Sequence, residues 1–301
     1  MFIVKYRKFF YTLSGIIMLG SLAVLIGWGL RLGIDFKGGS LIEVNYPNGR
    51  PDVSVIEKQL SAEKRGAFSV RPTGANGYIV RMETLDEAGR VAVTAGLSPD
   101  SKTRAEIKRF TSIGPVLGAE AARNSLYSIA FVILCIVLFI TFAFRKVSEP
   151  VASWKYGLIA IFALIHDVLV PTGAFVLLGH FAGVEVDTLF VTALLVVLGF
   201  SIHDTIVVFD RVRENLRLAR EYREKKSFEQ IVGESINQTF VRSINTSLTT
   251  VLALIVLYFV GGEATRYFSL ALLIGIVAGT YSSIFLGSPL LVTVEKWQKN
   301  K

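Results

Sequence analysis

The chain has 301 residues, of which 52% are hydrophobic and only 19% charged, and its formal net charge is +8. This balance excludes the soluble globular classes and indicates an integral membrane protein. The single cysteine, Cys135, excludes a disulfide framework, and three histidines without a cysteine cluster offer no metal-site spacing. We therefore expect neither a metal site nor a cofactor.

Six stretches are long and apolar enough to cross a bilayer, which takes about 20 residues. They cover residues 9–30, 124–144, 156–178, 188–209, 243–260 and 268–294. The first stretch exceeds the apolar core of a signal peptide, which runs to about 15 residues, so we expect a retained anchor. The predicted fold class is an α-helical polytopic membrane protein with six transmembrane helices.

Lys and Arg are distributed unevenly between the connecting segments. They gather in the amino-terminal segment 1–8, around Arg145, Lys146 and Lys155, in the connection 210–242 and in the tail 295–301. Basic loops stay on the cytoplasmic side, so both termini are expected there and the long loop 31–123 outside. The connection 210–242 is rich in charge and helix formers, which predicts that the fourth helix continues into the cytoplasm and turns back along the surface. The positive charge favours contact with anionic lipids over contact with nucleic acid.

The loop 31–123 is expected to fold as a small α+β domain. Its pattern predicts a strand at 41–46, a helix at 52–63, a hairpin of strands 67–73 and 78–83, a short helix within 84–102 and a last strand at 104–112. This order of elements is that of a ferredoxin-like split βαβ unit.

An aspartate, Asp204, lies inside the fourth apolar stretch. Insertion scales penalise an Asp at the centre of a spanning helix by about 2.5 to 3.5 kcal/mol, which makes such an acid a candidate functional site. Asp210 marks the edge of the stretch, and Asp204 lies roughly 9 Å inside it at the rise of an α-helix. A hydrogen-bonded packing carboxylate is the alternative to a proton-binding acid.

Polar residues recur at helical spacing around the start of the fifth span, and they predict a polar stripe facing the interior of the bundle. They are Gln238, Arg242, Asn245, Thr246 and Thr249. A helix that enters the membrane near Asn237 would place Arg242 about 7 Å deep, close to the depth of Asp204. Snorkelling of Arg242 to the headgroups is the alternative. We expect Asp204 and Arg242 to pair across a helix interface, so that protonation of Asp204 breaks the pair and lets the helices shift.

Three further ionisable residues lie inside spans. His166 and Asp167 fall near the middle of the third span, and Pro171 removes the backbone hydrogen bond to the Asp167 carbonyl. This arrangement suits a proton or water path, with local packing as the alternative. His203, beside Asp204, could titrate or donate a hydrogen bond.

No nucleotide-binding or hydrolytic signature is present: GxxxxGK[ST], HExxH and GxSxG are all absent. We expect no catalytic residues and no enzyme activity. The membrane potential, about 2.3 kcal/mol per charge per 100 mV, is the available source of energy.

Four motifs in order resemble the SecD/SecF family of protein-export membrane subunits over the whole chain. They are GIDFKGG at 33–39, IGPVLG at 113–118, GFSIHDTIVVFDRVREN at 199–215, and GGEA at 261–264 followed by LLIGIVAGTYSSIF at 272–285. The single small external domain favours the SecF branch, because SecD subunits have a much longer one.

The resemblance implies half of a resistance-nodulation-division (RND) type unit in the bacterial plasma (inner) membrane, completed by SecD. The pair would work with the SecYEG channel and the SecA motor, and would use the proton-motive force to promote late stages of polypeptide export. Asp204 and Arg242 match the transmembrane aspartate and arginine of the family, whereas His203 replaces its usual Asn. A half-size RND-type small-molecule exporter and an uncoupled membrane assembly chaperone are the alternatives.

Glycines in two of these motifs have expected structural roles. Gly33, Gly38 and Gly39 would hinge the external domain to the first span, since glycine adopts backbone conformations that other residues resist. Gly275 and Gly279 provide small residues for close helix contact in the sixth span.

Overall fold

The computed structural model describes residues 2–63, 66–98, 103–144 and 151–299, so Arg145, Lys146 and Lys301 lie outside the described residues. The chain divides into two compact units. A helical unit combines Met1–Arg31 with Tyr127–Lys301, and an α/β unit spans Leu32–Leu126.

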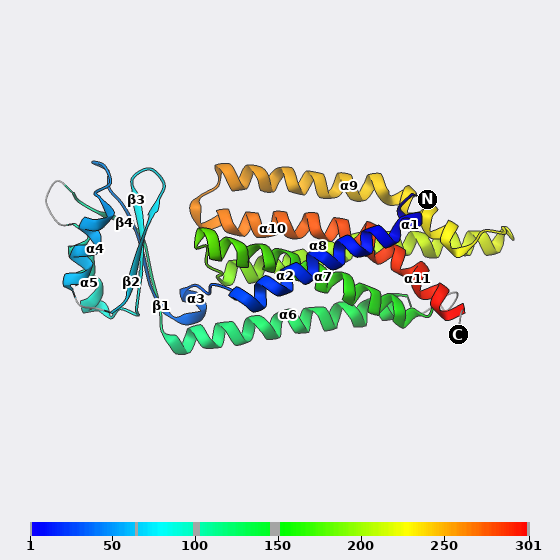
Figure 1. Cartoon of the computed structure of the whole chain (residues 1–301), viewed down its shortest axis with the longest axis horizontal. Coiled ribbons are helices and arrows are strands. Elements are labelled where there is room, and N and C mark those ends of the chain that lie inside the picture. Colours follow the sequence, from blue (N-terminus) through cyan, green and yellow to red (C-terminus); the bar gives the residue numbers. More distant parts are fainter. Residues whose placement is uncertain (1, 64–65, 99–102, 145–150, 300–301) are drawn as a thin grey trace. The chain divides into compact units, whose positions relative to one another are not determined.

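Six helices of the described residues are long and apolar enough to cross a membrane, which confirms the expected number of spans. They are α2 (Arg7–Trp28), α6 (Pro115–Ala143), α7 (Ser153–Ala182), α8 (Thr188–Glu221), α9 (Phe228–Val260) and a last helix built from α10 (Glu263–Tyr281), the π-helical turn η1 (Ser282–Gly287) and α11 (Ser288–Lys299). A short helix, α1 (Phe2–Lys5), precedes them. Figure 1 shows these helices running side by side in the helical unit.

The connection between the fourth and fifth spans is a hairpin of two long helices. Because α8 continues to Glu221 and α9 starts at Phe228, only residues 222–227 turn the chain. A capping box starts α9: the Ser227 side chain accepts from Gln230 N at 3.2 Å, and the Gln230 side chain accepts from Ser227 N at 2.8 Å. The charged segment continues both spans as helix, and residues 222–227 turn the chain back toward the fifth span.

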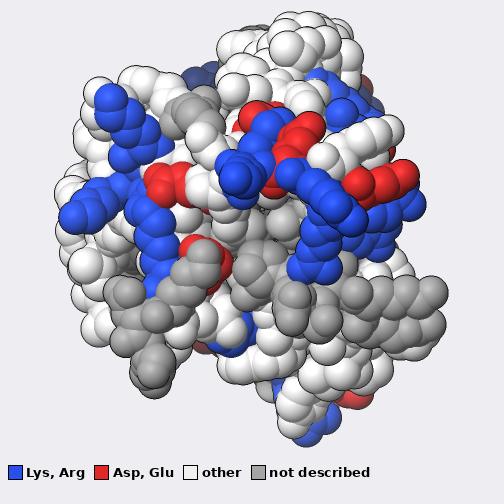
Figure 2. Space-filling model, turned by 90° about the vertical axis from the view of Figure 1, so that its right-hand side faces the viewer, with Lys and Arg blue, Asp and Glu red and all other residues white. Residues whose placement is uncertain are grey.

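Charged residues tie several helices together at the end of the helical unit that holds both chain termini, where Lys and Arg gather (Figure 2). Glu229 of α9 accepts from Arg7 Nη1 of α2 at 2.7 Å and is also bound by Lys296 of α11. The beginning and the end of the described chain are thus held to the same helix.

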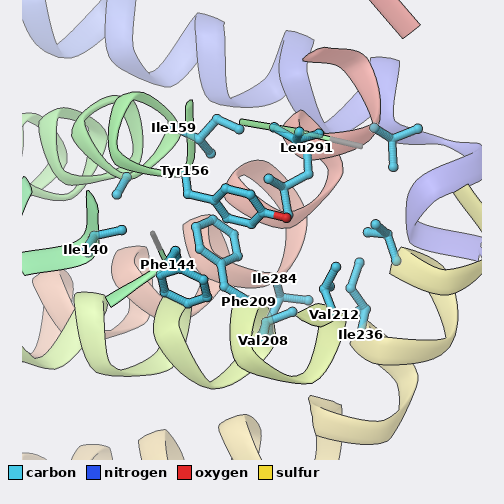
Figure 3. Close-up of a cluster of buried hydrophobic side chains, with 14 of the residues drawn as sticks. Ile140, Phe144, Tyr156, Ile159, Val208, Phe209, Val212, Ile236, Ile284 and Leu291 are labelled. Carbon is cyan, nitrogen blue, oxygen red and sulfur yellow. The ribbon is translucent and has the colours of Figure 1, made fainter. Parts of the chain in front are cut away.

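An aromatic cluster near this end packs α6 against α7 and α8. Figure 3 shows Tyr156 beside Phe144 and Phe209. The Tyr156 ring stacks on Phe144 at a centroid distance of 5.3 Å and meets Phe209 edge-on, also at 5.3 Å. Such pairs favour offset or edge-to-face geometry, so the cluster fixes how these helices approach. Farther along α6, large apolar side chains such as Phe131 and Leu138 are exposed, as on a helix that faces lipid.

The α/β unit has the predicted ferredoxin-like order. Its elements are a short helix α3 (Ile34–Lys37), then β1 (Gly39–Asn45), α4 (Val53–Ala62), β2 (Phe68–Thr73), β3 (Gly77–Met82), α5 (Glu87–Gly96) and β4 (Glu106–Ile113). The four strands form an antiparallel sheet in the order β2-β3-β1-β4, with Ile42 opposite both Val80 and Phe110. Asp52 and Asp86 cap α4 and α5 by accepting from Ser54 N and Gly89 N. The helix within 84–102 and the last strand are thus both present.

Alternate residues of the strands form the core of this unit with α4 and α5. Ile42 and Val44 of β1, and Tyr46 directly after it, are buried in one cluster with Ile56 of α4 and Val93 of α5. Tyr46 is 1% exposed, and its hydroxyl donates to the Leu97 carbonyl at 2.9 Å, which satisfies a polar group inside the core.

Tyr46→Phe is expected to destabilise the α/β unit by about 1 kcal/mol at pH 8, because the Leu97 carbonyl loses its donor. Burial raises the pKa of Tyr46 to about 12, above its ordinary value of 10. The stability linked to this neutral phenol is therefore complete below pH 10 and is lost as the pH rises from about 10 to about 12. The variant should consequently lose less stability in that range than the wild-type chain.

The measurement is urea unfolding of the full chain in detergent, followed by a fluorophore on Lys58→Cys in a Cys135→Ser background, since Lys58 is exposed on α4. Tyr78, whose pKa burial also raises, remains in both chains, so a smaller alkaline loss remains in the variant. Equal alkaline losses in the two chains would contradict the assignment to Tyr46.

Candidate functional site

Asp204 lies in the interior of the helical unit and has few hydrogen-bond donors. It is 2% exposed, and Ser247 Oγ of α9 lies 3.4 Å from its Oδ2. The Ser247 hydroxyl has one proton and also donates it to the Ser243 carbonyl at 2.9 Å, so Asp204 competes with a closer acceptor; the same oxygen lies 2.5 Å from Thr280 Oγ1 of α10. A buried carboxylate needs several donors to offset its lost hydration. Asp204 is therefore suited to hold a proton in this conformation.

The inner face of α9 is built from small hydroxyl residues one turn apart. Ser235, Thr239, Ser243 and Ser247 are all buried. Each of Ser235, Thr239 and Ser247 donates its hydroxyl to the carbonyl four residues earlier, which keeps a polar side chain satisfied within its own helix. This face lets α9 pack closely while placing one hydroxyl against Asp204.

Gly275 and Gly279 allow α10 to approach α8. A Cβ atom on Gly275 would lie 2.3 Å from Val197 Cγ2, and one on Gly279 would lie 2.8 Å from Ser201 Cβ. Both distances are below any normal carbon contact, so only glycine fits at this helix crossing. The crossing brings Thr280, the residue after Gly279, to the hydroxyl group beside Asp204.

Arg242 does not pair with Asp204 in this structure. Its side chain is exposed, and no ion pair joins these two residues, both of which the structure describes. Gln238, Asn245 and Thr249 are exposed as well, so the predicted polar stripe of α9 faces away from the bundle. Within this chain the small hydroxyl residues occupy the interior, and the larger polar side chains lie outside its six-helix bundle. The pairing of Asp204 with Arg242 stays a prediction.

His203 is also exposed, although the neighbouring Asp204 is buried, because adjacent residues of a helix point in different directions. His203 and Arg242 both lie within electrostatic range of the Asp204 carboxyl group. We name the set His203, Arg242, Asn245 and Thr249 the outward polar face. Gln238 lies toward the hairpin end, where it accepts from Arg211 Nε at 2.6 Å and from Asn215 Nδ2 at 2.9 Å.

The structure brings His166 and Asp167 into a second buried polar cluster. His166 Nδ1 lies 2.9 Å from Asp167 Oδ1, and the two side chains are 2% and 0% exposed. Asp167 Oδ2 accepts from Ser201 of α8 and from Ser282 of η1, the latter at 2.9 Å. Asp167 thus joins three elements, α7, α8 and η1.

The π-helical turn η1 directs two consecutive serines to different partners. Ser282 reaches Asp167, whereas Ser283 bonds with Thr205 Oγ1 at 2.8 Å and donates to the Ser201 carbonyl at 3.2 Å. π-helical turns are rare and occur frequently at functional sites. The motif at 272–285 contains both serines, but the sequence gives them no predicted role. Hydroxyl residues in an apolar helix have no distinctive spacing.

Gly38 and Gly39 lie in a closely packed part of the α/β unit. Gly38 has φ +78° and Gly39 has φ +129°, and a Cβ on Gly38 would lie 2.8 Å from Pro115 Cα. Gly33 has an extended backbone that any residue can adopt. Close packing accounts for glycine at 38 and 39, and the predicted hinge at Gly33, Gly38 and Gly39 stays a prediction.

Among the described residues, no group of three or more His, Cys, Asp or Glu side chains could hold a metal ion. The two polar clusters around Asp204 and Asp167 consist of carboxylates, one imidazole and hydroxyls. The carboxylates and the imidazole of these clusters can bind and release protons.

The chain matches two described protein families. Residues 94–297 match the family "Protein export membrane protein SecD/SecF, C-terminal", and residues 25–46 match the "SecD/SecF GG Motif". It is 45% identical to the protein translocase subunit SecF of Thermobaculum terrenum, covering 97% of this chain and 93% of the relative. It is 38% identical to the corresponding subunit of Anaerolinea thermophila, covering 96% and 92%.

Its structure is similar to the crystal structure of SecDF, a translocon-associated membrane protein from Thermus, with a TM-score of 0.81 at 28% identity. The match covers 99% of this chain but only 38% of the SecDF chain. A second SecDF structure, in a super-membrane-facing form, matches with a TM-score of 0.69 at 30% identity.

Proposed function

Because the chain belongs to the SecD/SecF family of protein-export membrane proteins, we propose that it is the SecF half of a unit that uses the proton-motive force to drive protein export. The observation that carries this proposal is Asp204, a buried carboxyl group with a single long hydrogen bond, next to an outward face with a histidine and an arginine. An acid in this position can exchange a proton when its surroundings change. The chain contributes no nucleotide hydrolysis of its own to this work.

SecD is the partner that would cover the outward polar face. In lipid, Arg242, Asn245 and His203 would meet hydrocarbon, which is costly for a charged side chain, so another protein surface is expected there. The SecDF chain includes more than twice the length that this chain matches, which is consistent with a second half on a separate subunit here.

Proton exchange at Asp204 would be coupled to a shift of α8 against α9. In the present conformation the acid lies beside Ser247, and after loss of its proton the carboxylate would be drawn toward Arg242. One proton that moves through about 150 mV supplies about 3.5 kcal/mol, enough to shift a two-state equilibrium several-hundred-fold. This energy suffices to bias a moving domain, and not to unfold a stable substrate.

The proposed location is the bacterial plasma membrane, with both termini and the α8–α9 hairpin in the cytoplasm. The Lys and Arg residues at this end of the helical unit support that orientation and would contact anionic lipid headgroups (Figure 2). The α/β unit would then lie outside, where it would act on polypeptides that leave the SecYEG channel after the SecA motor has delivered them.

Cross-linking tests the partner and its position. A single cysteine at Asn245, in a Cys135→Ser chain, is expected to cross-link to a SecD-type subunit in native membranes, because Asn245 belongs to the outward polar face. The matched control is Leu134→Cys on α6, which is 52% exposed and has exposed apolar neighbours such as Phe131 and Leu138.

Cross-linking to SecD at Asn245 and not at Leu134, with the SecYEG channel in the same purified complex, is the predicted result. Equal cross-linking at Asn245 and Leu134 would contradict the proposal that SecD binds the outward polar face. A product with no SecD-type chain would favour a stand-alone exporter or an assembly chaperone.

A further inference from the structure

Asp167 and His166 form a buried pair that the exchange of a proton at Asp204 does not require. We propose that this pair is a second proton-binding centre, which receives its proton through His166 from an apolar groove between α2, α7 and α10. The inference extends the proposed proton-driven function, but the contacts that support it do not include Asp204.

The charge of the pair is the first reason. An ionised Asp167 with a neutral His166 leaves one negative charge in the interior, and among the described residues no Lys or Arg forms an ion pair with it. The groups that face Asp167 are the His166 imidazole and two hydroxyls, Ser201 on α8 and Ser282 on η1. One further proton makes the pair neutral, which a low-dielectric interior favours.

The second reason is an imidazole nitrogen without a partner. His166 Nδ1 is bonded to Asp167, whereas His166 Nε2 is buried and has no hydrogen-bond partner among the described residues. Nearly all buried polar atoms in proteins have a partner, so this nitrogen has an unused capacity to bind a proton or a hydrogen-bond donor. Water or a proton carried by water is the smallest such group.

The third reason is a groove that reaches His166. It has a volume of about 400 Å³ and is lined by Leu13 and Ile17 of α2, His166 and Val170 of α7, and Leu273, Ile274, Val277, Ala278 and Tyr281 of α10. Tyr281, whose ring centroid lies 6.0 Å from that of His166, is the other titratable group here. Its hydroxyl is held by Ser14 of α2 and the Phe10 carbonyl, at 3.2 Å each, so it does not compete for His166.

The proton transfer uses both imidazole nitrogens. Nε2 takes up a proton from the groove, and the proton on Nδ1 passes to Asp167 Oδ1 across the 2.9 Å contact. The imidazole returns to its neutral form with the proton on Nε2, and the pair has gained one proton. A protonated Asp167 accepts more weakly from Ser201 and Ser282, so its protonation state acts on both α8 and the π-helical turn.

Infrared difference spectroscopy of the full chain in lipid vesicles, recorded over a pH titration, detects the carboxyl directly. In an Asp204→Asn chain, a buried carboxyl band is expected to appear as the pH falls. It should lose intensity when Asp167→Asn is added, while the buried Glu295 keeps its own carboxyl group. Ser282→Ala in the Asp204→Asn chain should move the midpoint of this band, because the charged form loses a hydrogen-bond donor. Ser288→Ala, whose hydroxyl bonds only the Ser283 carbonyl, is the matched control and should leave the midpoint unchanged.

Absence of the band in the Asp204→Asn chain, or a band of unchanged intensity after Asp167→Asn is added, would overturn the second centre. If the doubly substituted chain fails to elute as a folded protein, the Ser282→Ala substitution in the Asp204→Asn chain provides the test. In that case an unchanged midpoint of the carboxyl band contradicts the proposal. The band reports proton binding and not export, so the result does not depend on whether Asp204 drives transport.

Discussion

Replacing Asp204 with Asn is expected to abolish the stimulation of protein export by the proton-motive force. Asn cannot bind or release a proton, yet it has nearly the same size and can still contact Ser247, so the bundle should assemble. We expect the translocation rate with a membrane potential to fall to the rate of vesicles that lack the chain. The measurement is transport of a secreted polypeptide into membrane vesicles that contain SecYEG, SecA and SecD.

Two variants test whether the effect belongs to the buried carboxyl. Asp204→Glu keeps a titratable group and should retain part of the stimulation. Asp210→Asn removes an exposed carboxylate that pairs with Arg213 one turn later, and stimulation should be unaffected. Full stimulation of export in the Asp204→Asn chain would contradict the proposed proton exchange at Asp204.

Gly38→Ala is expected to destabilise the α/β unit strongly, by several kcal/mol. Its backbone has φ +78° and ψ +169°, a region available almost only to glycine, and holding an alanine in it costs of order 1 to 3 kcal/mol. The new Cβ would also lie 2.8 Å from Pro115 Cα, which is backbone and cannot turn aside. Urea unfolding with the fluorophore at Lys58→Cys measures the loss.

The matched control is Gly74→Ala in the turn between β2 and β3. Gly74 has φ +53°, but nothing lies within 4 Å of a Cβ there, so only backbone strain of about 1 kcal/mol is expected. Equal losses at Gly38 and Gly74 would show that the contact with Pro115 has no effect.

The six spans and the α/β unit could be predicted because each rests on a local pattern. The period of two in β1 acts within a few residues of chain. The structure adds the caps Asp52 and Asp86, which act over the same short range at the starts of α4 and α5. The apolar length of the spans has the same local character.

The orientation of the α9 stripe could not be predicted, for a physical reason. Helical spacing shows that Arg242, Asn245 and Thr249 share a face, but inside a membrane a polar face can point toward the bundle or toward a partner protein. The buried face turned out to be the one with Ser243 and Ser247. These small residues have no hydropathy signal of their own, and their role appears only when the helices are in contact.

The two carboxylates were identified from the sequence, and their partners were not. Asp167 accepts a hydrogen bond from Ser282, which lies in a π-helical turn. The extra residue in such a turn changes which side chains face inward. No spacing rule for a regular helix would place Ser282 against α7 and Ser283 against α8.

The central claim is that Asp204 exchanges a proton in the course of transport, and proton flux tests it most directly. The chain and SecD would be reconstituted in vesicles with a pH-sensitive dye inside, and the internal pH would be followed after a membrane potential is imposed. We predict a flux that the wild-type pair supports and the Asp204→Asn pair lacks, with Asp210→Asn indistinguishable from wild type. An undiminished flux through the Asp204→Asn pair would contradict the account.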